Sequence, residues 1–327
     1  MKKRIAIVLA LVLALSLCAC SGEGQGETAN GGETTETYVV GICQLMTHNS
    51  LDAATQGFKD ALIAQLGEEH VEFKHQDAGG EYTNCGVIVD GFVAEGVDLI
   101  LANATPPLQA AVAATAETPV LGTSVTDYAT ALNIADWTGT VGGNVSGTTD
   151  LAPLDQQAQV IQELFPDAET VGMLYCSAEP NSVYQITRVK GCLEEMGYTC
   201  EEYAFADVNE LSAGCQTACD NSDVIYIPTD NTCATYTETI ANVVLPAGIP
   251  VVASEASTCA AAGVATLAID YYDLGYATGL MAAKILTGEA DVSTMPVESA
   301  GEATKMYNPA NCELLGVTVP EGYEPVG

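Results

Sequence analysis

Short polar segments follow seven of the expected strands, and they carry groups that bind small polar molecules. Hydroxyl, amide and carboxylate side chains occur at residues 46–50, 103–107, 123–127, 177–182, 228–231, 254–255 and 270–273. Several segments precede an expected helix, whose first backbone N–H groups favour an anionic ligand group. A single segment of this kind is better explained as a helix cap. Seven of them in a twofold pattern favour a shared ligand-binding cleft.

The histidines and acids of the chain predict no catalytic or metal-binding arrangement. His70 and His75 flank one short strand, and their five-residue spacing places them on opposite faces, so we expect exposed strand histidines. His48 either contacts a ligand or caps a helix. Cys43 near His48 lacks the third group that orients a catalytic base. Carboxylate pairs arise by chance among 43 acids, and no GxxxxGK[ST] or GxGxxG segment follows a strand. We expect no catalysis, no metal and no cofactor.

Alternating strand and helix patterns must position these groups. Strands are expected at 38–45, 71–74, 97–102, 119–122, 170–175, 199–203, 223–227, 250–253 and 264–268, and helices at 51–66, 84–95, 108–117, 154–164 and 183–196. Ser50 is the expected N-cap of the first helix and Gly67 its stop. Because parallel strands need crossover helices, the pattern predicts two doubly wound parallel-sheet lobes of the α/β class. Such sheets bind ligands beyond the carboxyl ends of their strands.

Charge and composition exclude several classes of function. The 327 residues hold 9 Lys+Arg and 43 Asp+Glu, a formal net charge of −34. Nucleic-acid binding and docking onto an anionic membrane both need clustered cations, which are absent here. The hydrophobic share of 48% and the mean hydropathy of +0.20 exclude a disordered chain. At roughly 150 residues per domain, the length predicts about two domains.

The N-terminus is typical of an exported lipoprotein. Lys2, Lys3 and Arg4 precede an apolar run at 5–17, which is too short to span a bilayer. Leu17-Cys18-Ala19-Cys20 resembles a bacterial lipobox, so we expect a signal peptide at 1–19, a lipidated Cys20 and a flexible acidic linker through residue 37. An ordinary secretory signal is the alternative. Removal of residues 1–19 leaves six cations and a charge of −37. We therefore expect an extracytoplasmic protein, lipid-anchored to the outer face of the cell membrane.

Ten cysteines follow Cys20, at 43, 85, 176, 192, 200, 215, 219, 233, 259 and 312. An oxidising compartment would allow disulfides, with Cys192/Cys200 and Cys215/Cys219 the nearest pairs. Their dispersal through apolar segments favours free, buried thiols instead. The sequence leaves both interpretations open.

Several segments, in consistent order from about residue 38 to 320, carry a family resemblance. Gly41-Ile42-Cys43-Gln44, Tyr226-Ile227-Pro228-Thr229-Asp230-Asn231 and Asp270-Tyr271-Tyr272-Asp273-Leu274-Gly275 are the most informative. With them, the chain resembles the ABC-transporter substrate-binding lipoproteins of the tryptophan/tyrosine-uptake type, which have the type I periplasmic-binding fold. That resemblance implies two lobes joined by a three-crossing hinge, with 38–147 plus 270–295 in one lobe and 148–269 plus 304–327 in the other.

The resemblance also implies a function and a set of site residues. It implies capture of a small zwitterion, an amino acid with aromatic ones favoured, by a monomer that delivers it to an ABC permease and ATPase. The matching positions are Gln44, Thr105, Thr123, Ser124, Asn181, Ser182, Thr229, Asp230, Asn231, Ser254, Glu255 and Asp270. We assign Thr105, Thr123 and Ser124 to the ligand carboxylate, and Asp230, Glu255 and Asp270 to its ammonium. The chain departs from the family pattern at Asn49, Tyr128, Pro180 and Glu255.

Ligand selectivity stays open at this level. Candidate aromatic walls are Tyr128, Trp137, Tyr184 and Tyr271, each of which is equally suited to core or rim packing. None of the six cations beyond the signal lies at a strand end, so we expect no arginine clamp on the ligand carboxylate. The alternatives are a nucleoside or sugar receptor of the same fold, a sensory module without transport, and a surface hydrolase.

Overall fold

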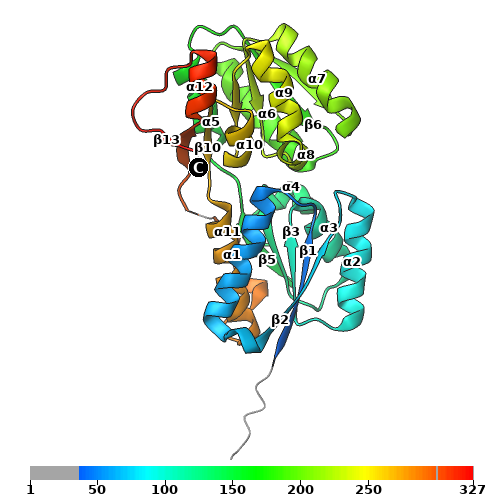
Figure 1. Cartoon of the computed structure of the whole chain (residues 1–327). Helices are drawn as coiled ribbons and strands as arrows, with labels where there is room; N and C mark the ends of the chain where they lie inside the picture. The colour runs from blue at the N-terminus through cyan, green and yellow to red at the C-terminus, as the bar shows by residue number, and fades with distance from the viewer. Residues whose placement is uncertain (1–36, 300, 327) are drawn as a thin grey trace, which may run out of the picture. The chain divides into compact units, whose positions relative to one another are not determined.

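The computed structural model describes residues 37–299 and 301–326, which belong to one compact unit. Two sheets organise these residues, and each defines a lobe (Figure 1). The predicted signal peptide, Cys20 and all but the last residue of the predicted linker lie outside the described residues. Within the described part, every helix falls short of the length and apolarity that a bilayer crossing needs.

The first lobe is built on a six-stranded sheet in the order β11-β5-β4-β3-β1-β2, and its strand pairs are parallel. Its elements are β1 (Tyr38–Gln44), α1 (Asn49–Leu66), the 3-10 helix η1 (Glu68–His70), β2 (Val71–Asp77), α2 (Tyr82–Glu95), β3 (Leu99–Asn103), α3 (Thr105–Ala114), β4 (Val120–Val125), α4 (Tyr128–Leu132), β5 (Val145–Thr149), α11 (Tyr271–Leu286), the 3-10 helix η2 (Val292–Thr294) and β11 (Glu298–Ser299).

The second lobe is built on a seven-stranded sheet in the order β13-β12-β10-β9-β8-β6-β7. Its elements are α5 (Leu154–Leu164), β6 (Thr170–Cys176), α6 (Pro180–Glu195), β7 (Thr199–Phe205), α7 (Val208–Asn221), β8 (Val224–Ile227), α8 (Asn231–Thr235), α9 (Thr237–Ala247), β9 (Val251–Ala253), α10 (Ala256–Ala261), β10 (Ala265–Ala268), β12 (Thr304–Tyr307), α12 (Pro309–Leu315) and β13 (Glu324–Pro325). Only the β10–β12 pair among the described strands is antiparallel.

Alternating side chains on each strand bury both faces of each sheet under helices. Val40 and Ile42 of β1 pack with Phe58 of α1, on the face that α1 and α11 cover. Cys43 of the same strand packs with Phe92 of α2 on the opposite face. In the second lobe, α5 and α6 cover one face and α7 and α9 the other (Figure 1). The expected pair of helix-covered parallel sheets is therefore confirmed, because side chains of successive strand residues point to opposite faces.

The chain crosses between the lobes three times, between β5 and α5, between β10 and α11, and between β11 and β12. Two boundaries differ from the expectation. Thr148 and Thr149 still pair with neighbouring strands of the first sheet, two residues beyond the predicted end at 147. Glu298 and Ser299 add a strand to that sheet, in a segment expected to lie between the lobes. Both segments are too short and too polar to predict a strand without their hydrogen-bonded neighbours.

The expected N-cap of the first helix is wrong. His48 occupies that position with extended backbone, and α1 begins at Asn49, so Ser50 lies inside the first turn. Gly67 ends the helix as expected, with its N–H on the carbonyl of Ile63. The hydroxyl of Ser50 therefore does not cap the helix, and it forms a hydrogen bond with Glu255 of the second lobe.

Helices α1 and α11 cross with their backbones in direct contact. A Cβ added at Gly275 would overlap the carbonyl oxygen of Ala54, and one at Gly57 would overlap the carbonyl oxygen of Tyr272. Backbone atoms on both sides leave no flexible side chain to yield. The crossing therefore requires glycine, for its lack of a Cβ and not for its backbone freedom.

We expect Gly275→Ala to lower the free energy of unfolding by about 2 kcal/mol through overpacking at this crossing. Gly91→Ala in α2 is the control, because a Cβ at Gly91 meets open space. That control should gain about 0.5–1 kcal/mol, since Ala costs less backbone entropy in a helix than Gly. Urea unfolding of both variants measures the difference, and equal stabilities would contradict the close crossing.

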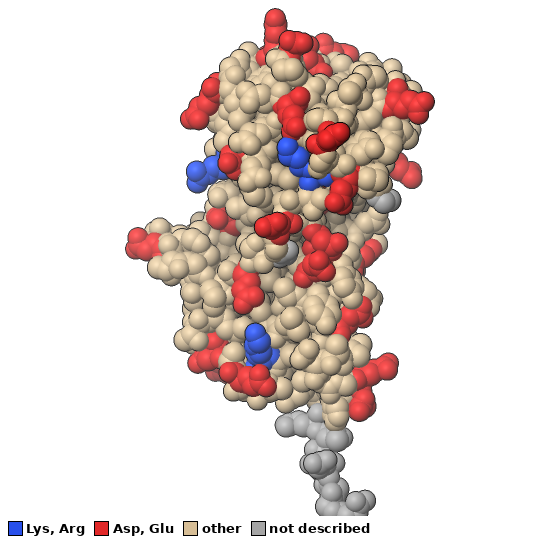
Figure 2. All heavy atoms as spheres, turned by 90° about the vertical axis from the view of Figure 1, so that its left-hand side faces the viewer, with Lys and Arg blue, Asp and Glu red and all other residues tan. Residues whose placement is uncertain are grey.

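Acidic side chains dominate the surface. Figure 2 shows them scattered over one face of the protein, with few Lys and Arg among them. Three described cations form exposed ion pairs, Lys74 with Glu95, Lys190 with Glu202 and Lys305 with Glu163. Each pair lies within one lobe, and exposed pairs of this kind contribute about 0–1 kcal/mol each. The ten described cysteines are free thiols, eight of them buried.

Candidate functional site

A small cavity lies where the strand ends of the two lobes meet. Its open volume is about 10 Å³, room for about one water molecule, and nine residues line it: His48, Leu51, Ser124, Asp150, Asn181, Thr229, Asn231, Glu255 and Tyr271. Ser124 lies near the end of β4, and each of the others follows a strand or stands at the start of the next helix, after β1 and β5 of the first lobe and after β6, β8, β9 and β10 of the second. Five of the nine, Ser124, Asn181, Thr229, Asn231 and Glu255, are residues that the sequence predicted.

Four buried polar atoms that line this cavity have no hydrogen-bond partner within the protein. They are Nδ1 of His48, Oγ of Ser124, Oδ1 of Asp150 and Oδ1 of Asn181. Buried polar groups are nearly always paired, so an unpaired one requires an explanation. Four such atoms around one cavity make it the candidate ligand site.

Asp150 is held in place by one of its two oxygens. Oδ2 accepts a hydrogen bond of 2.9 Å from the Tyr271 hydroxyl, and Oδ1 remains unpaired. Burial raises the pKa of the Asp150 carboxyl, while the hydrogen bond from Tyr271 works against that shift. No Lys or Arg stands among the nine lining residues. The free oxygen is therefore suited to accept from a cationic group on a ligand.

Asn181 presents an acceptor to the same space. Its Nδ2 donates to the carbonyl oxygen of Thr229 at 2.9 Å and to Glu179 Oε2 at 3.2 Å. These two acceptors define the orientation of the amide, which places Oδ1 on the unpaired side. Asn181 and Asp150 together offer two acceptor oxygens that have no partner within the protein.

Ser124 stands in a strained part of the backbone. Its φ of 55° lies in the left-handed region, which is uncommon for a residue other than glycine. The register of β4 against β5 shifts between Gly122 and Val125, so Ser124 is the residue that leaves the ladder. Strain of this kind occurs at ligand sites, and here it turns a hydroxyl without a protein partner toward the cavity.

His48 bridges the lobes through its other ring nitrogen. Nε2 lies 3.3 Å from Oδ1 of Asn231, and Nδ1 is the unpaired atom. Burial lowers the pKa of His48, which favours the neutral imidazole. Because Oδ1 of Asn231 can only accept, Nε2 carries the proton of the neutral ring, and Nδ1 is left as an acceptor.

Several hydrogen bonds join the lobes around this cavity. Ser50 donates to Glu255 Oε2 at 2.5 Å, and Gln185 donates to Thr126 at 3.3 Å. Farther out, Tyr82 donates to the carbonyl oxygen of Ala178 at 3.2 Å, and Thr235 donates to the sulfur of Met46 at 3.0 Å. The lobes are therefore closed on one another in this structure.

Glu255 is the carboxyl of the second lobe that meets the first. Burial raises its pKa to about 8, and the negative charges of Asp150 and Asp230 add to that effect. The hydrogen bonds from Ser50 and Ser257 oppose it. Glu255 therefore holds a proton near neutral pH unless a positive charge enters the cavity.

The raised pKa of Glu255 predicts how stability depends on pH. The folded protein binds this proton more tightly than the unfolded chain, whose pKa is near 4.5. The resulting stability is fully present below that value and is lost as the pH rises through about 8. We expect the free energy of unfolding of the ligand-free protein to fall across this range, and to fall less in Glu255→Gln. Urea unfolding at a series of pH values tests this, and parallel curves for the two proteins would contradict it.

Asp230, assigned from the sequence to the ligand ammonium, does not line this cavity. Its Oδ1 accepts from the backbone N–H of Cys233, and Oδ2 accepts from the N–H of Cys176 and the hydroxyl of Ser182. These distances are 2.7 to 2.8 Å, and the residue is fully buried. Burial and the charge of Glu179 raise its pKa to about 7. Asp230 caps the N-terminus of α8, and Ser182 donates a hydrogen bond to its carboxylate.

Asp270 lies outside the cavity as well. It is exposed, and its carboxylate caps α11 through the N–H of Asp273 at 3.0 Å. The neighbouring Tyr271 enters the cavity in its place. A single residue step decides which side chain of this segment faces inward.

The remaining predicted residues are placed around the cavity and do not line it. Gln44 is bound internally by Asp52 and Thr55, and Thr123 lies within the first lobe 3.3 Å from the hydroxyl of Thr148. Ser254 bonds Thr229 through their hydroxyls at 3.0 Å, which positions a lining residue. Thr105 lines a smaller neighbouring cavity together with Asn181.

The candidate aromatic walls also lie in different places, and only some of them reach a cavity. Tyr271 lines the cavity, whereas Tyr128 is buried in the first lobe and stacks on the half-exposed Trp137 at a centroid distance of 6.4 Å. Tyr184 lines the smaller neighbouring cavity. Tyr271 and Leu51 are thus the large apolar groups that the main cavity offers to a ligand.

Sequence reasoning missed Leu51 and Asp150, and it left the role of His48 open. Asp150 follows β5, which is short and contains Gly147, so no strand pattern marked the residue as the end of one. The resemblance placed a hinge near it, and that was the available signal. The described residues contain no group of three or more His, Cys, Asp or Glu side chains arranged to hold a metal ion.

Comparisons with known proteins identify the family of this chain. The profile of the family described as ABC transporter substrate binding protein matches residues 39–323. A tyrosine-binding protein of Clostridioides difficile strain R20291 is 31% identical over 278 residues, which cover 84% of this chain and 80% of that protein.

Two solved structures are similar in sequence and fold. The ABC domain from Streptococcus pneumoniae in complex with L-Trp is 31% identical, with a TM-score of 0.83 over 88% of this chain and 97% of that one. The ligand-free, open structure of a substrate-binding protein with adhesive properties from Clostridium difficile is 32% identical, with a TM-score of 0.69 over 89% and 99%. On the strength of the family match and of these relatives, this chain belongs to the ABC transporter substrate-binding proteins and has the type I periplasmic-binding fold.

Proposed function

We propose that this protein is the extracytoplasmic receptor of an ABC importer and that it captures a zwitterionic amino acid, with aromatic ones favoured, between its two lobes. The observation that carries the proposal is the set of four unpaired polar atoms on one cavity. Lipid attachment at Cys20 is part of the proposal and rests on the lipobox-like sequence.

The cavity offers separate partners for the two charges of an amino acid. Oδ1 of Asp150 and Oδ1 of Asn181 are acceptors, as an ammonium group requires. The Ser124 hydroxyl and the first N–H groups of α1, at the helix end that favours negative charge, are donors for a carboxylate. Relative to the sequence prediction, Asp150 takes the ammonium role assigned to Asp230 and Asp270.

Ammonium binding also fits the protonation of the site. Glu255 and Asp150 have raised pKa values because they are buried without a cation among the lining residues. An entering ammonium group would favour their ionised forms, so binding should tighten as the pH rises toward about 8. A dianionic ligand would be repelled by the ionised forms of Glu255 and Asp150 and would find no Lys or Arg among the lining residues.

The relatives support an aromatic amino acid. One is named a tyrosine-binding protein and another was solved with L-Trp. The closed lobes support the same reading, because this structure scores 0.83 against the L-Trp complex and 0.69 against the open, ligand-free protein at nearly equal identity. Leu51 and Tyr271 supply apolar surface for the side chain of such a ligand. Delivery to a permease and ATPase, without chemical change of the ligand, completes the proposed function.

Calorimetry on residues 21–327 tests the proposal with L-tyrosine, L-tryptophan, L-leucine, a nucleoside and a hexose. We expect an aromatic amino acid to bind with a Kd of about 1 μM or tighter. Tryptamine and indole-3-propionate, which each lack one of the two charges, should bind at least about tenfold more weakly, a loss of about 1.4 kcal/mol. Binding of the nucleoside or hexose alone would establish the alternative receptor, and recovery of a cleaved ligand would establish a hydrolase.

A further inference from the structure

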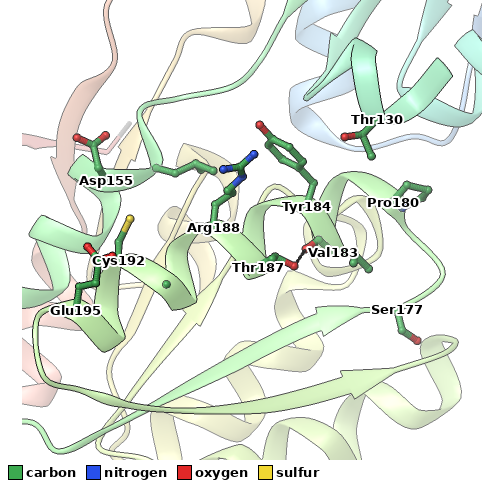
Figure 3. A pocket seen from close by; sticks show the side chains of 12 residues that line it. Thr130, Asp155, Ser177, Pro180, Val183, Tyr184, Thr187, Arg188, Cys192 and Glu195 are labelled. Atoms are coloured by element: carbon green, nitrogen blue, oxygen red, sulfur yellow. Dashed lines mark hydrogen bonds between the residues drawn. The ribbon is translucent and has the colours of Figure 1, made fainter. Parts of the chain in front are cut away.

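A large groove runs along α6, outside the proposed ligand cavity. Its volume is about 1110 Å³, and it is lined by Thr130, Leu154, Asp155, Ser177, Pro180, Val183, Tyr184, Thr187, Arg188, Gly191, Cys192 and Glu195. Eight of these residues lie on α6 at helical spacing and so share one face of the helix. Figure 3 shows Tyr184 and Arg188 rising from this face into the space between Asp155 and Thr130. The groove therefore has one wall on α6 and its other edges on α5 and on the first lobe.

A series of shared residues connects this groove with the ligand cavity. Thr130, Pro180 and Tyr184 also line a small intermediate cavity, which is too narrow in this closed structure to admit a water molecule. Asn181 lines both this intermediate cavity and the ligand cavity. Asn181, Tyr184 and Arg188 stand three and four residues apart, so they follow one another along α6. The helix face leads from solvent to the acceptor oxygen of Asn181.

Arg188 supplies a positive charge that has no acidic partner among the described residues. No carboxylate oxygen lies within ion-pair distance of its guanidinium, as is also true of Lys59 and Lys284, whereas Lys74, Lys190 and Lys305 are paired. The guanidinium lies over the ring of Tyr184, 5.4 Å from its centroid. Unlike Lys59 and Lys284, Arg188 lines the groove. Asp155 and Glu195 lie on the same groove and offer negative charge beside it.

We propose that the α6 groove is an outer binding site, where a zwitterionic aromatic amino acid is captured with its carboxylate on Arg188 before it passes to the inner cavity. The guanidinium binds a carboxylate through two donors, and the apolar side chains of Leu154, Pro180 and Val183 accept an aromatic ring. Asp155 lies on the same groove to receive the ammonium group. This inference rests on the proposed function, since it takes the same ligand class.

The test compares Arg188→Gln with Lys190→Gln, which removes one positive charge from the same helix outside the groove. L-Tryptophan is the probe, and stopped-flow fluorescence measures its association and dissociation rates. An outer site lies on the path and leaves the final complex unchanged. We therefore expect Arg188→Gln to lower both rates by the same factor, about tenfold at low ionic strength, with Kd unchanged. Lys190→Gln should match the wild type, and salt should reduce the difference between the variants.

Different results would overturn different parts of the argument. Wild-type binding of L-tryptophan with equal association rates in Arg188→Gln and Lys190→Gln would reject the outer site and leave the proposed function standing. Equal rates combined with loss of amino-acid uptake by cells carrying Arg188→Gln would assign the groove to contact with the permease instead. Absence of L-tyrosine and L-tryptophan binding by the wild type would reject both the proposed function and the outer site.

Discussion

Asp150→Asn should weaken the binding of L-tyrosine or L-tryptophan by about 10- to 100-fold, about 1.4–2.8 kcal/mol. The substitution keeps the shape of the side chain and an oxygen that can accept from Tyr271, which now stands 2.9 Å from Oδ2. It removes the negative charge that we assign to the ligand ammonium. Hydrogen bonds to charged groups are worth about 1.5–3 kcal/mol, and this one would be buried. Calorimetric titration of the variant measures the change.

Asp270→Asn is the matched control for this experiment. It removes one acidic charge close to the same crossing, and Asn retains the ability to cap α11. Because Asp270 is exposed and bonded to its own helix, ligand affinity should remain within about twofold of the wild type, about 0.4 kcal/mol. A large loss in Asp270→Asn with none in Asp150→Asn would reverse the assignment and restore the sequence prediction.

Asp230→Ala should lower the free energy of unfolding by about 3–5 kcal/mol. The carboxylate accepts hydrogen bonds from two buried backbone N–H groups, of Cys176 and Cys233, and from the buried hydroxyl of Ser182. Alanine leaves all three donors without an acceptor, and each such donor costs about 1–3 kcal/mol. Urea unfolding in the absence of ligand measures the loss. The ligand affinity of the folded fraction should change little, because Asp230 does not line the cavity.

Ser182→Ala isolates one of these three contacts. It removes a single donor and leaves the carboxylate with its two N–H partners, so we expect a loss of about 1 kcal/mol. A stable Asp230→Ala protein that no longer binds an aromatic amino acid would show that Asp230 acts on the ligand after all. The pair of variants therefore separates a structural role from a binding role.

Much of the fold follows from local patterns in the sequence. Apolar residues spaced three and four apart predict helices over 84–95 and 154–164, and the structure has them at Tyr82–Glu95 and Leu154–Leu164. These signals depend on neighbours within a few residues, so they survive without tertiary information. The strands that were missed, such as Val145–Thr149, are short and polar, and their partners hold them in the sheet.

The candidate site divides along the same line. The strand ends were predictable, and so was the polar chemistry that gathers there, because parallel sheets place these ends at one edge. Which polar group faces the cavity was not predictable. Asp230 and Asp150 both follow strands. Both carboxylate oxygens of Asp230 accept hydrogen bonds from backbone N–H groups, whereas Oδ1 of Asp150 has no partner within the protein.

By itself, the sequence determined the class of the protein: two α/β lobes, polar strand ends, and a surplus of acid that excludes polyanionic partners. The tertiary structure decided the direction of each side chain at those ends. Ser50 and Glu255 are 205 residues apart, and they meet only because the lobes close. A side chain's direction at a strand end depends on where the next helix begins and on what packs across the cleft. The start of the helix and the packing across the cleft both depend on residues far away in the sequence. Only the tertiary structure could therefore distinguish the side chains that cap helices from those that keep a polar atom unpaired at the cavity.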